Sequence, residues 1–380
     1  MSRNKGPELE TRPASDGWAV ASLVALLVVA VSAEYLFRRS ERQPKPPKFF
    51  SSSGQHGAQH EPIDEGGRGR LAGTPSELSR RGWRDILLRV YANIGNHRIL
   101  SLAAGMTYYS LLAIFPALAA LVAVYGLFAD PSSIARHLDQ AAGFLPGGAI
   151  DVAREQLDRV ASKGAQTLGL TFLAGLGISL WSANAAMKSL FDTLNIVYGE
   201  QAKRGFVKLN AMSLLFTVGG IVFVLAALGA IVVVPVVLNF VGLSDAADLL
   251  LRIGRWPAMF VVLTLALAFI YRHAPSRQAP RWRWISWGSA VAALLWLGVS
   301  ALFSWYAAHF GNFNETYGSL GAVIGFMTWL WISAIVILLG AELNAEMEHQ
   351  TVRDTTTGVP KPLGMRGARM ADTVGAPQRG

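Results

Sequence analysis

Long apolar runs alternate with polar connectors along most of the chain. Seven stretches are long enough to cross a bilayer as helices, because a hydrocarbon core of about 30 Å requires about 20 apolar residues. They cover roughly residues 17–37, 100–128, 166–187, 209–235, 257–271, 284–308 and 319–343. The fifth is the shortest, and the sequence does not define the residue near Pro257 at which it begins. The pattern predicts an all-α fold, a polytopic transmembrane helical bundle.

Charged residues avoid these stretches. None of the 34 lysines and arginines falls inside them, and of the 25 acids only Glu34 and Glu342 do. A charge at the centre of a bilayer costs at least about 2.5 kcal/mol, so membrane burial selects this separation. The composition, with 52% hydrophobic and 16% charged residues, is also that of an integral membrane protein.

Lysine and arginine concentrate in alternate connectors. Segments 38–99, 188–208, 272–283 and 344–380 hold 25 of them, and the intervening segments hold 9. Because positively charged connectors stay on the cytoplasmic side, we expect a multi-pass protein of the bacterial inner membrane. Its N-terminus is predicted outside and its C-terminus in the cytoplasm.

Composition divides the chain into five parts. Residues 1–16 form a short external N-terminus, followed by an extra N-terminal transmembrane helix at 17–37. A basic stop follows that helix and favours an anchor over a cleaved signal peptide, although cleavage stays an open alternative. Residues 38–79 are predicted to be a disordered, basic cytoplasmic linker, and 351–380 a disordered cytoplasmic tail. The membrane domain occupies 80–350.

The start of the membrane domain has the pattern of an amphipathic helix. Its apolar positions recur at helical spacing, opposite Arg84, Arg89 and Asn93. They are Trp83, Ile86, Leu87, Val90, Tyr91 and Ile94. Such a helix suits the inner membrane interface. A helix packed on the cytoplasmic ends of the bundle is an equally compatible interpretation.

Several classes of chemistry have no support in the sequence. There are no cysteines, and the seven histidines lie far apart without metal-ligand spacing. No phosphate-binding GxxxxGK[ST] loop and no GxSxG nucleophile motif occur. We therefore expect no catalytic residues, no metal, no cofactor and no enzyme activity. The net charge of +9 is interpreted as a topology signal and a contact with anionic lipids, with no nucleic-acid partner.

Polar residues inside the spans suggest a cluster at the cytoplasmic mouth of a path. The second span contributes Thr107, Tyr108, Tyr109 and Ser110, the third Asn184, Lys188 and Asn195, and the last Glu342. If the three segments are neighbours, these side chains meet on one side of the membrane. The alternative is a structural hydrogen-bond network that ties helix ends together.

Two further groups of residues are candidates for the membrane boundaries. The stretch FNETYGSLGAVIGF begins the last span, and we expect an outer cap and packing seam from Asn314, Glu315, Tyr317, Gly318, Gly321 and Gly325. The connector 272–283 carries Arg272, Arg277, Arg281 and Arg283 beside Trp282, Trp284 and Trp287, as an interfacial belt does. These arginines are predicted to contact lipid head groups.

Four motifs in order resemble the YihY/BrkB family of bacterial inner-membrane proteins. They are AAGMTYYSLLAIFP, LWSANAAMKSLFDTLNIVYGE, YRHAPSRQAPRWRWISWGSAVAALLW and FNETYGSLGAVIGFMTWLWISAIVILLGAELNAE. The resemblance covers about 80–350 and implies a six-helix family core, to which the helix at 17–37 is added. It also implies a link to serum resistance and to export of lipopolysaccharide precursors or other lipids. Part of the family has carried the label ribonuclease BN, which the missing metal-ligand spacing argues against.

Three functions therefore stay open. The first is translocation of envelope lipids or lipid precursors, whose anionic head groups the basic inner rim recruits. The second is transport of a small solute or ion, using Glu342 and the tyrosines. The third is a membrane scaffold that transports nothing, in which the polar cluster is structural.

Overall fold

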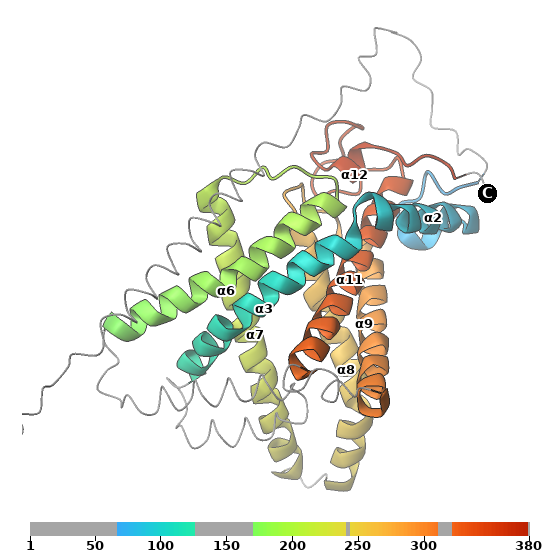
Figure 1. Cartoon of the computed structure of the whole chain (residues 1–380). Helices are drawn as coiled ribbons and strands as arrows, with labels where there is room; N and C mark the ends of the chain where they lie inside the picture. The colour runs from blue at the N-terminus through green and yellow to red at the C-terminus, as the bar shows by residue number, and fades with distance from the viewer. Residues whose placement is uncertain (1–66, 126–169, 241–243, 311–320, 379–380) are drawn as a thin grey trace, which may run out of the picture. The chain divides into compact units, whose positions relative to one another are not determined.

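The structure, a computed structural model, describes residues 67–125, 170–240, 244–310 and 321–378. All of them belong to one compact unit, Glu61–Gly380. Every long element in these ranges is an α-helix, so the all-α prediction is confirmed (Figure 1). The segments 1–16 and 17–37 lie outside the described residues, and their assignments stay predictions.

Seven long helices and two short ones follow one another in the described ranges. They are η1 (Pro75–Glu77), α2 (Arg80–Asn96), α3 (Ile99–Tyr125), α6 (Leu170–Val197), α7 (Phe206–Phe240), α8 (Ser244–His273), α9 (Trp282–Phe310), α11 (Gly321–Gln350) and α12 (Arg369–Asp372). Four described stretches have the length and hydropathy to cross a membrane: Phe206–Ala226, Trp256–His273, Trp282–Tyr306 and Val323–Gln350. A shorter apolar stretch, Ile99–Ile114, begins α3.

Helix ends differ from the predicted spans at three places. Helix α8 begins at Ser244, and Pro257 lies inside it, because a proline removes one backbone hydrogen bond without having to end a helix. Helices α6 and α11 continue past the expected ends at 187 and 343 to Val197 and Gln350. Their polar final turns stay helical because other segments bury and bond them.

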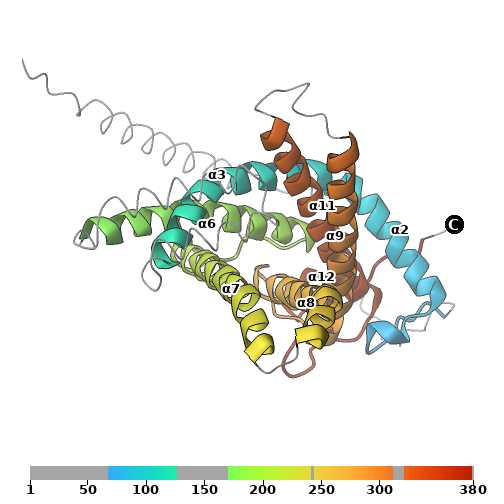
Figure 2. The same cartoon turned by 90° about the horizontal axis from the view of Figure 1, so that it is seen from below.

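Antiparallel packing arranges the helices around one core. Figure 1 shows α3 beside α6 and α9 beside α11, and Figure 2 shows the same neighbours from below. Helix α8 packs on α9, and α11 also contacts α2, α3 and α6. The core is built from Phe191, Tyr198, Tyr271, Leu338 and smaller residues, all buried.

Helices α9 and α11 approach each other closely at two glycines. A Cβ atom at Gly340 would collide with Ala292 and with the hydroxyl of Tyr271, and one at Gly288 would collide with the amide of Asn344. The Gly288 amide also donates to Asn344 Oδ1 at 3.0 Å. Small residues therefore fix this helix pair, as is common between helices in membranes.

Two tryptophans join α9 and α11 farther along the same interface. Trp296 Nε1 donates to Ser333 Oγ at 3.1 Å, and Trp329 Nε1 donates to Ser300 Oγ at 3.2 Å. The two indole rings pack edge to face, with centroids 5.8 Å apart. Each helix thus supplies one donor and one acceptor.

Three segments pack around the C-terminal end of α11, namely α2, residues 67–79 and residues 351–378. We call this end of the protein the capped end. Figure 1 shows α2 crossing α11 there. At the corner between α2 and α3, Arg98 adopts a left-handed backbone conformation with φ of 51°. That conformation turns the chain sharply from the crossing helix into α3.

The predicted disorder at both ends of the membrane domain is wrong for residues 67–79 and 351–378. Arg70 donates to the Gly375 carbonyl at 2.6 Å, and Thr351 Oγ1 donates to the Ala72 carbonyl at 2.8 Å. Arg366 is 4% exposed and donates to the carbonyls of Ala371 and Val352 at 2.6 and 2.7 Å. Composition suggested disorder because both segments are rich in glycine, proline and charged residues, but here the guanidinium groups bond backbone carbonyls and order the chain.

Candidate functional site

Three buried carboxylates occupy the last turns of α11 at the capped end. Glu342, Glu346 and Glu348 are each at most 2% exposed. Glu342 and Glu346 are one helical turn apart and face α2, whereas Glu348 faces the connector after α8. We call these three residues and their partners the carboxylate cluster.

Two side chains at the end of α2, Asn93 and His97, form hydrogen bonds with Glu342. Asn93 Nδ2 donates to Glu342 Oε1 at 2.6 Å, and His97 Nδ1 lies 3.0 Å from Oε2. This hydrogen bond to Glu342 raises the pKa of His97, although burial of the ring acts in the opposite direction. The pair is therefore able to hold a proton between an imidazole and a carboxylate.

Glu346 is neutralised by an arginine of the same helix α2. Arg89 Nε donates to Glu346 Oε2 at 2.5 Å, and its Nη2 donates to Gln350 Oε1 at 2.7 Å. Asn93 Nδ2 also donates to Glu346 Oε1 at 2.9 Å, which links this pair to Glu342. Arg89 and Asn93 therefore face inward, because α11 supplies buried acids that accept their hydrogen bonds.

Glu348 forms an ion pair that is closed to solvent. Arg277 Nη1 and Nη2 donate to the two carboxylate oxygens at 2.9 Å each, and both side chains are completely buried. The guanidinium lies 3.9 Å from the ring centroid of Tyr198, and Thr355 Oγ1 donates to Glu348 Oε2 at 3.2 Å. This arrangement satisfies a buried charge pair by planar, bidentate bonding.

Arg277 was expected at the lipid surface, and the structure corrects that expectation. The other three arginines of the connector have different surroundings. Arg272 lies over the Trp282 ring at 4.4 Å, Arg281 Nε donates to the Thr356 carbonyl at 3.0 Å, and Arg283 is exposed. Trp282 and Trp287 are about half exposed, whereas Trp284 is buried.

The predicted polar cluster does not form one site, and three of its members lie in three different places. Glu342 belongs to the carboxylate cluster. Asn184 accepts a 3.4 Å hydrogen bond from Thr217 Oγ1, between α6 and α7. Asn195 Oδ1 accepts from the Ser276 amide at 2.7 Å and so ties α6 to the connector after α8.

The remaining members of that set lie on α3 and α6. Thr107 is buried and bonds back to the Ala103 carbonyl at 2.8 Å. Tyr108 and Tyr109 are 56% and 37% exposed, with ring centroids 5.6 Å apart, and Ser110 is half-buried. The ammonium of Lys188 lies 4.9 Å from the ring centroid of the exposed Trp181. A path through these residues stays a prediction.

The outer cap is only partly within the described residues. Asn314, Glu315, Tyr317 and Gly318 lie outside them. Gly321 is the first residue of α11, and Gly325 follows one turn later.

Sequence reasoning missed most partners of the carboxylate cluster, namely Arg89, Asn93, His97, Glu346, Glu348 and Tyr198. One signal was available: Arg89, Asn93 and His97 share one spacing of four, and Glu342 and Glu346 have the same spacing. When one helix carries hydrogen-bond donors and its neighbour carries carboxylates at the same spacing of four, the two helices can form several contacts along their length. No group of three or more potential metal ligands occurs among the described residues.

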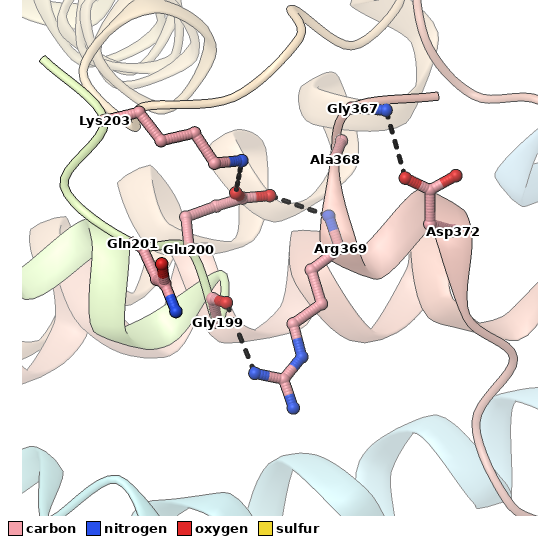
Figure 3. Close-up of a pocket in the computed structure, with 8 residues that line it drawn as sticks. All are labelled: Gly199, Glu200, Gln201, Lys203, Gly367, Ala368, Arg369 and Asp372. Atoms are coloured by element: carbon pink, nitrogen blue, oxygen red, sulfur yellow. Dashed lines mark hydrogen bonds and ion pairs between the residues drawn. The ribbon is translucent and has the colours of Figure 1, made fainter. Parts of the chain in front are cut away.

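A separate open depression lies beside α12. It has a volume of about 270 Å³ and is lined by Gly199, Glu200, Gln201, Lys203, Gly367, Ala368, Arg369 and Asp372 (Figure 3). Glu200 accepts from Lys203 Nζ at 2.8 Å and from the Arg369 amide at 2.7 Å. Figure 3 shows Glu200 bonded to the Arg369 amide and the Arg369 guanidinium bonded to the Gly199 carbonyl, two contacts that tie the C-terminal segment to the α6–α7 connector.

Comparison with known proteins gives one family and several relatives. The family model described as "Virulence factor BrkB" matches residues 90–362. The ribonuclease-like protein YfkH of Bacillus subtilis is 28% identical over 267 residues, which cover 68% of this chain and 94% of that protein. A UPF0761 membrane protein of Alkalilimnicola ehrlichii is 28% identical over 75% of this chain and 64% of its own length. Another, from Pseudoalteromonas translucida, is 25% identical over 67% of this chain and 82% of its own length. No solved structure matches.

Proposed function

The chain belongs to the virulence factor BrkB family of membrane proteins, and from this premise we propose that it translocates envelope lipids or lipid precursors of the lipopolysaccharide type. In this proposal the protein resides in the bacterial inner membrane with the capped end in the cytoplasm. The excess of lysine and arginine in the segments of that end supports the orientation.

The observation that carries the proposal is the exposed apolar side of α2. Leu87, Leu88 and Tyr91 are 56%, 39% and 76% exposed, while Arg89 on the opposite side is 6% exposed. Helix α2 therefore packs on α11 through Ile86, Arg89 and Asn93 and leaves Leu87, Leu88 and Tyr91 outward. Exposed apolar side chains on one side of such a helix suit a position in a lipid interface.

A contact with α9 connects this surface to the membrane boundary. The rings of Trp83 and Trp287 lie 6.2 Å apart, and Trp287 belongs to the first turns of the span formed by α9. Arg84 of α2 and Arg283 of α9 are both exposed. Apolar side chains with arginines beside them are the chemistry that attracts anionic lipid head groups.

Reconstitution tests the proposal. Purified protein is placed in vesicles that contain phosphatidylglycerol with a fluorescent label, and loss of fluorescence to a quencher outside the vesicles reports movement between leaflets. We expect faster movement than in vesicles without protein. The double variant Leu87→Ser, Tyr91→Ser should slow it, because the interface helix loses its apolar side.

The matched control is Val359→Ser, which changes an exposed apolar residue of the C-terminal segment. It should leave the rate unchanged. Equal rates with and without protein, for labelled phosphatidylglycerol and for a lipopolysaccharide precursor alike, would refute lipid translocation.

A second candidate, transport of a small solute or ion, is favoured by the pair of the buried Glu342 and the half-buried His97. A proton held at 3.0 Å between these groups could couple solute movement to a pH gradient. Glu342→Gln keeps the shape and removes the charge. If proton uptake into protein-containing vesicles is identical for this variant and the unmodified protein, the second candidate is excluded. Nuclease activity is not part of either proposal.

A further inference from the structure

A line of polar residues runs along α6 and α7, and four of them are buried. The buried ones are Asn184 on α6 and Asn210, Ser213 and Thr217 on α7, and the half-buried Lys188 and Asp192 follow Asn184 at spacings of four; we call this set the α6–α7 seam. Asn184 and Ser213 are completely buried, and Thr217 and Asn210 are 8% and 9% exposed. The spacings of three and four place each set on one side of its helix.

Hydrogen bonding in the seam is incomplete. Ser213 and Thr217 donate back to carbonyls of their own helix, at 2.8 and 2.9 Å. The amide nitrogen of Asn184 and the amide oxygen of Asn210 have no hydrogen-bond partner among the described residues. Exchanging the oxygen and nitrogen of Asn184 lets the nitrogen donate to Thr217 Oγ1, whose one proton goes to the Ser213 carbonyl, but it leaves the amide oxygen of Asn184 without a partner.

The seam reaches deep into the membrane. The Thr217–Asn184 hydrogen bond sets the antiparallel register, which brings Lys188 level with Ser213. Thr217 lies roughly 16 Å along α7 from Phe206, about half of a hydrocarbon core. The Phe206 end belongs to the capped end, because Glu200 before it bonds Arg369.

The glycines of α6 and α7 lie outside the seam. Gly175, Gly177, Gly219 and Gly220 are exposed, and a Cβ atom added at any of them would meet no other atom within 4 Å. These four glycines therefore make no close contact of the kind that joins α9 and α11. Unsatisfied polar atoms in a membrane interior are costly, so their presence indicates a state in which another polar group bonds them.

We propose that the α6–α7 seam is a water-accessible path that enters the membrane from the capped end and ends at Asn184. Its neutral amide and hydroxyl groups bind water and the hydroxyl groups of a polar solute. This proposal does not depend on lipid translocation, since water access is a property of the helix pair itself.

Cysteine labelling tests the path directly, because the chain contains no cysteine. Ser213→Cys and Thr217→Cys place single thiols in the seam. Leu215→Cys and Val218→Cys place thiols at matched depth on the exposed side of α7, where the residues are 64% and 38% exposed and face lipid. A charged, membrane-impermeant thiol reagent is added on the side of the capped end.

We expect the seam thiols to react at least about tenfold faster than the depth-matched thiols, because a thiol in hydrocarbon does not ionise. Adding Asn184→Leu should slow the reaction at Thr217→Cys, because leucine closes the inner end of the path. Complete labelling after denaturation and an unchanged melting temperature show that each variant is present and folded. Equal rates at all four positions, or no reaction in the seam, would overturn the proposal. Lipid movement is measured separately, so either proposal can fail alone.

Discussion

Arg277 and Glu348 form a two-pronged ion pair from which solvent is fully excluded, with both N–O distances at 2.9 Å. The pair joins the connector after α8 to the final turns of α11. Arg277 was expected to contact lipid head groups, but in this position it holds two segments together inside the protein.

Breaking this pair should strongly destabilise the protein. Glu348→Gln leaves the Arg277 charge buried without a counter-charge, which costs about 3–5 kcal/mol when a buried pair is broken. The melting temperature in detergent measures the loss. Arg283→Gln, which changes an exposed arginine of the same region, is the control and should melt like the unmodified protein. A normal melting temperature for Glu348→Gln would show that solvent reaches Arg277.

Stability should fall as the pH rises through neutrality. The hydrogen bond from Glu342 raises the pKa of His97 above its ordinary value of about 6.5, so the folded state favours the protonated imidazole. This contribution is complete below the unfolded pKa and is lost as the pH rises through the folded pKa. Glu346 also favours the proton, whereas Arg369 opposes it.

Melting temperatures between about pH 5.5 and about pH 8.5 test this dependence, since the range brackets the titration of histidine. His97→Gln should remove the part of the pH dependence of the melting temperature that His97 contributes. His273→Gln changes a histidine outside the carboxylate cluster and should retain it. The same slope in His97→Gln as in the unmodified protein would assign the pH dependence to other groups.

Two glycines of α9 should respond oppositely to alanine. Gly288→Ala places a Cβ against the Asn344 amide, and such overpacking costs about 1–3 kcal/mol. Gly298→Ala adds a methyl group where nothing lies within 4 Å and should be neutral or slightly stabilising. Thermal melting of the two single variants compares them. Equal effects would mean that α9 and α11 can separate at no cost.

The C-terminal segment should be protected from hydrogen exchange. Arg366 bonds the carbonyls of Lys361, Arg353, Ala371 and Val352. Arg366→Ala removes these bonds, each worth about 1.5–3 kcal/mol for a charged donor, and should expose residues 351–378 to fast exchange. Arg353→Ala removes an exposed side chain nearby and is the control. Fast exchange already in the unmodified protein would restore the sequence-based prediction of disorder.

The helices could be predicted from the sequence, but the partners of their polar ends could not. Apolar runs and the exclusion of charge located α7, α9 and α11, because each run obeys a simple length requirement. Helical spacing placed Arg89 on the polar side of α2, opposite the apolar residues, but it did not show which acid accepts its hydrogen bonds. That acid, Glu346, lies 257 residues away, and only the folded chain shows the contact. The tail was misjudged for the same reason, because Arg366 is ordered by carbonyls that composition does not specify.

The placement of the three acids on α11 also fixes the angular setting of that helix. Glu342 and Glu346 point towards α2, and Glu348 is turned away from Glu346 by roughly 200° because each helical residue advances about 100°. Rotating α11 about its axis by one residue would break all three contacts at once and leave each carboxylate facing apolar neighbours. A single-residue insertion within α11 should therefore be far more harmful than most substitutions there. The membrane-embedded part of the helix and the three acids could then not both keep their native contacts.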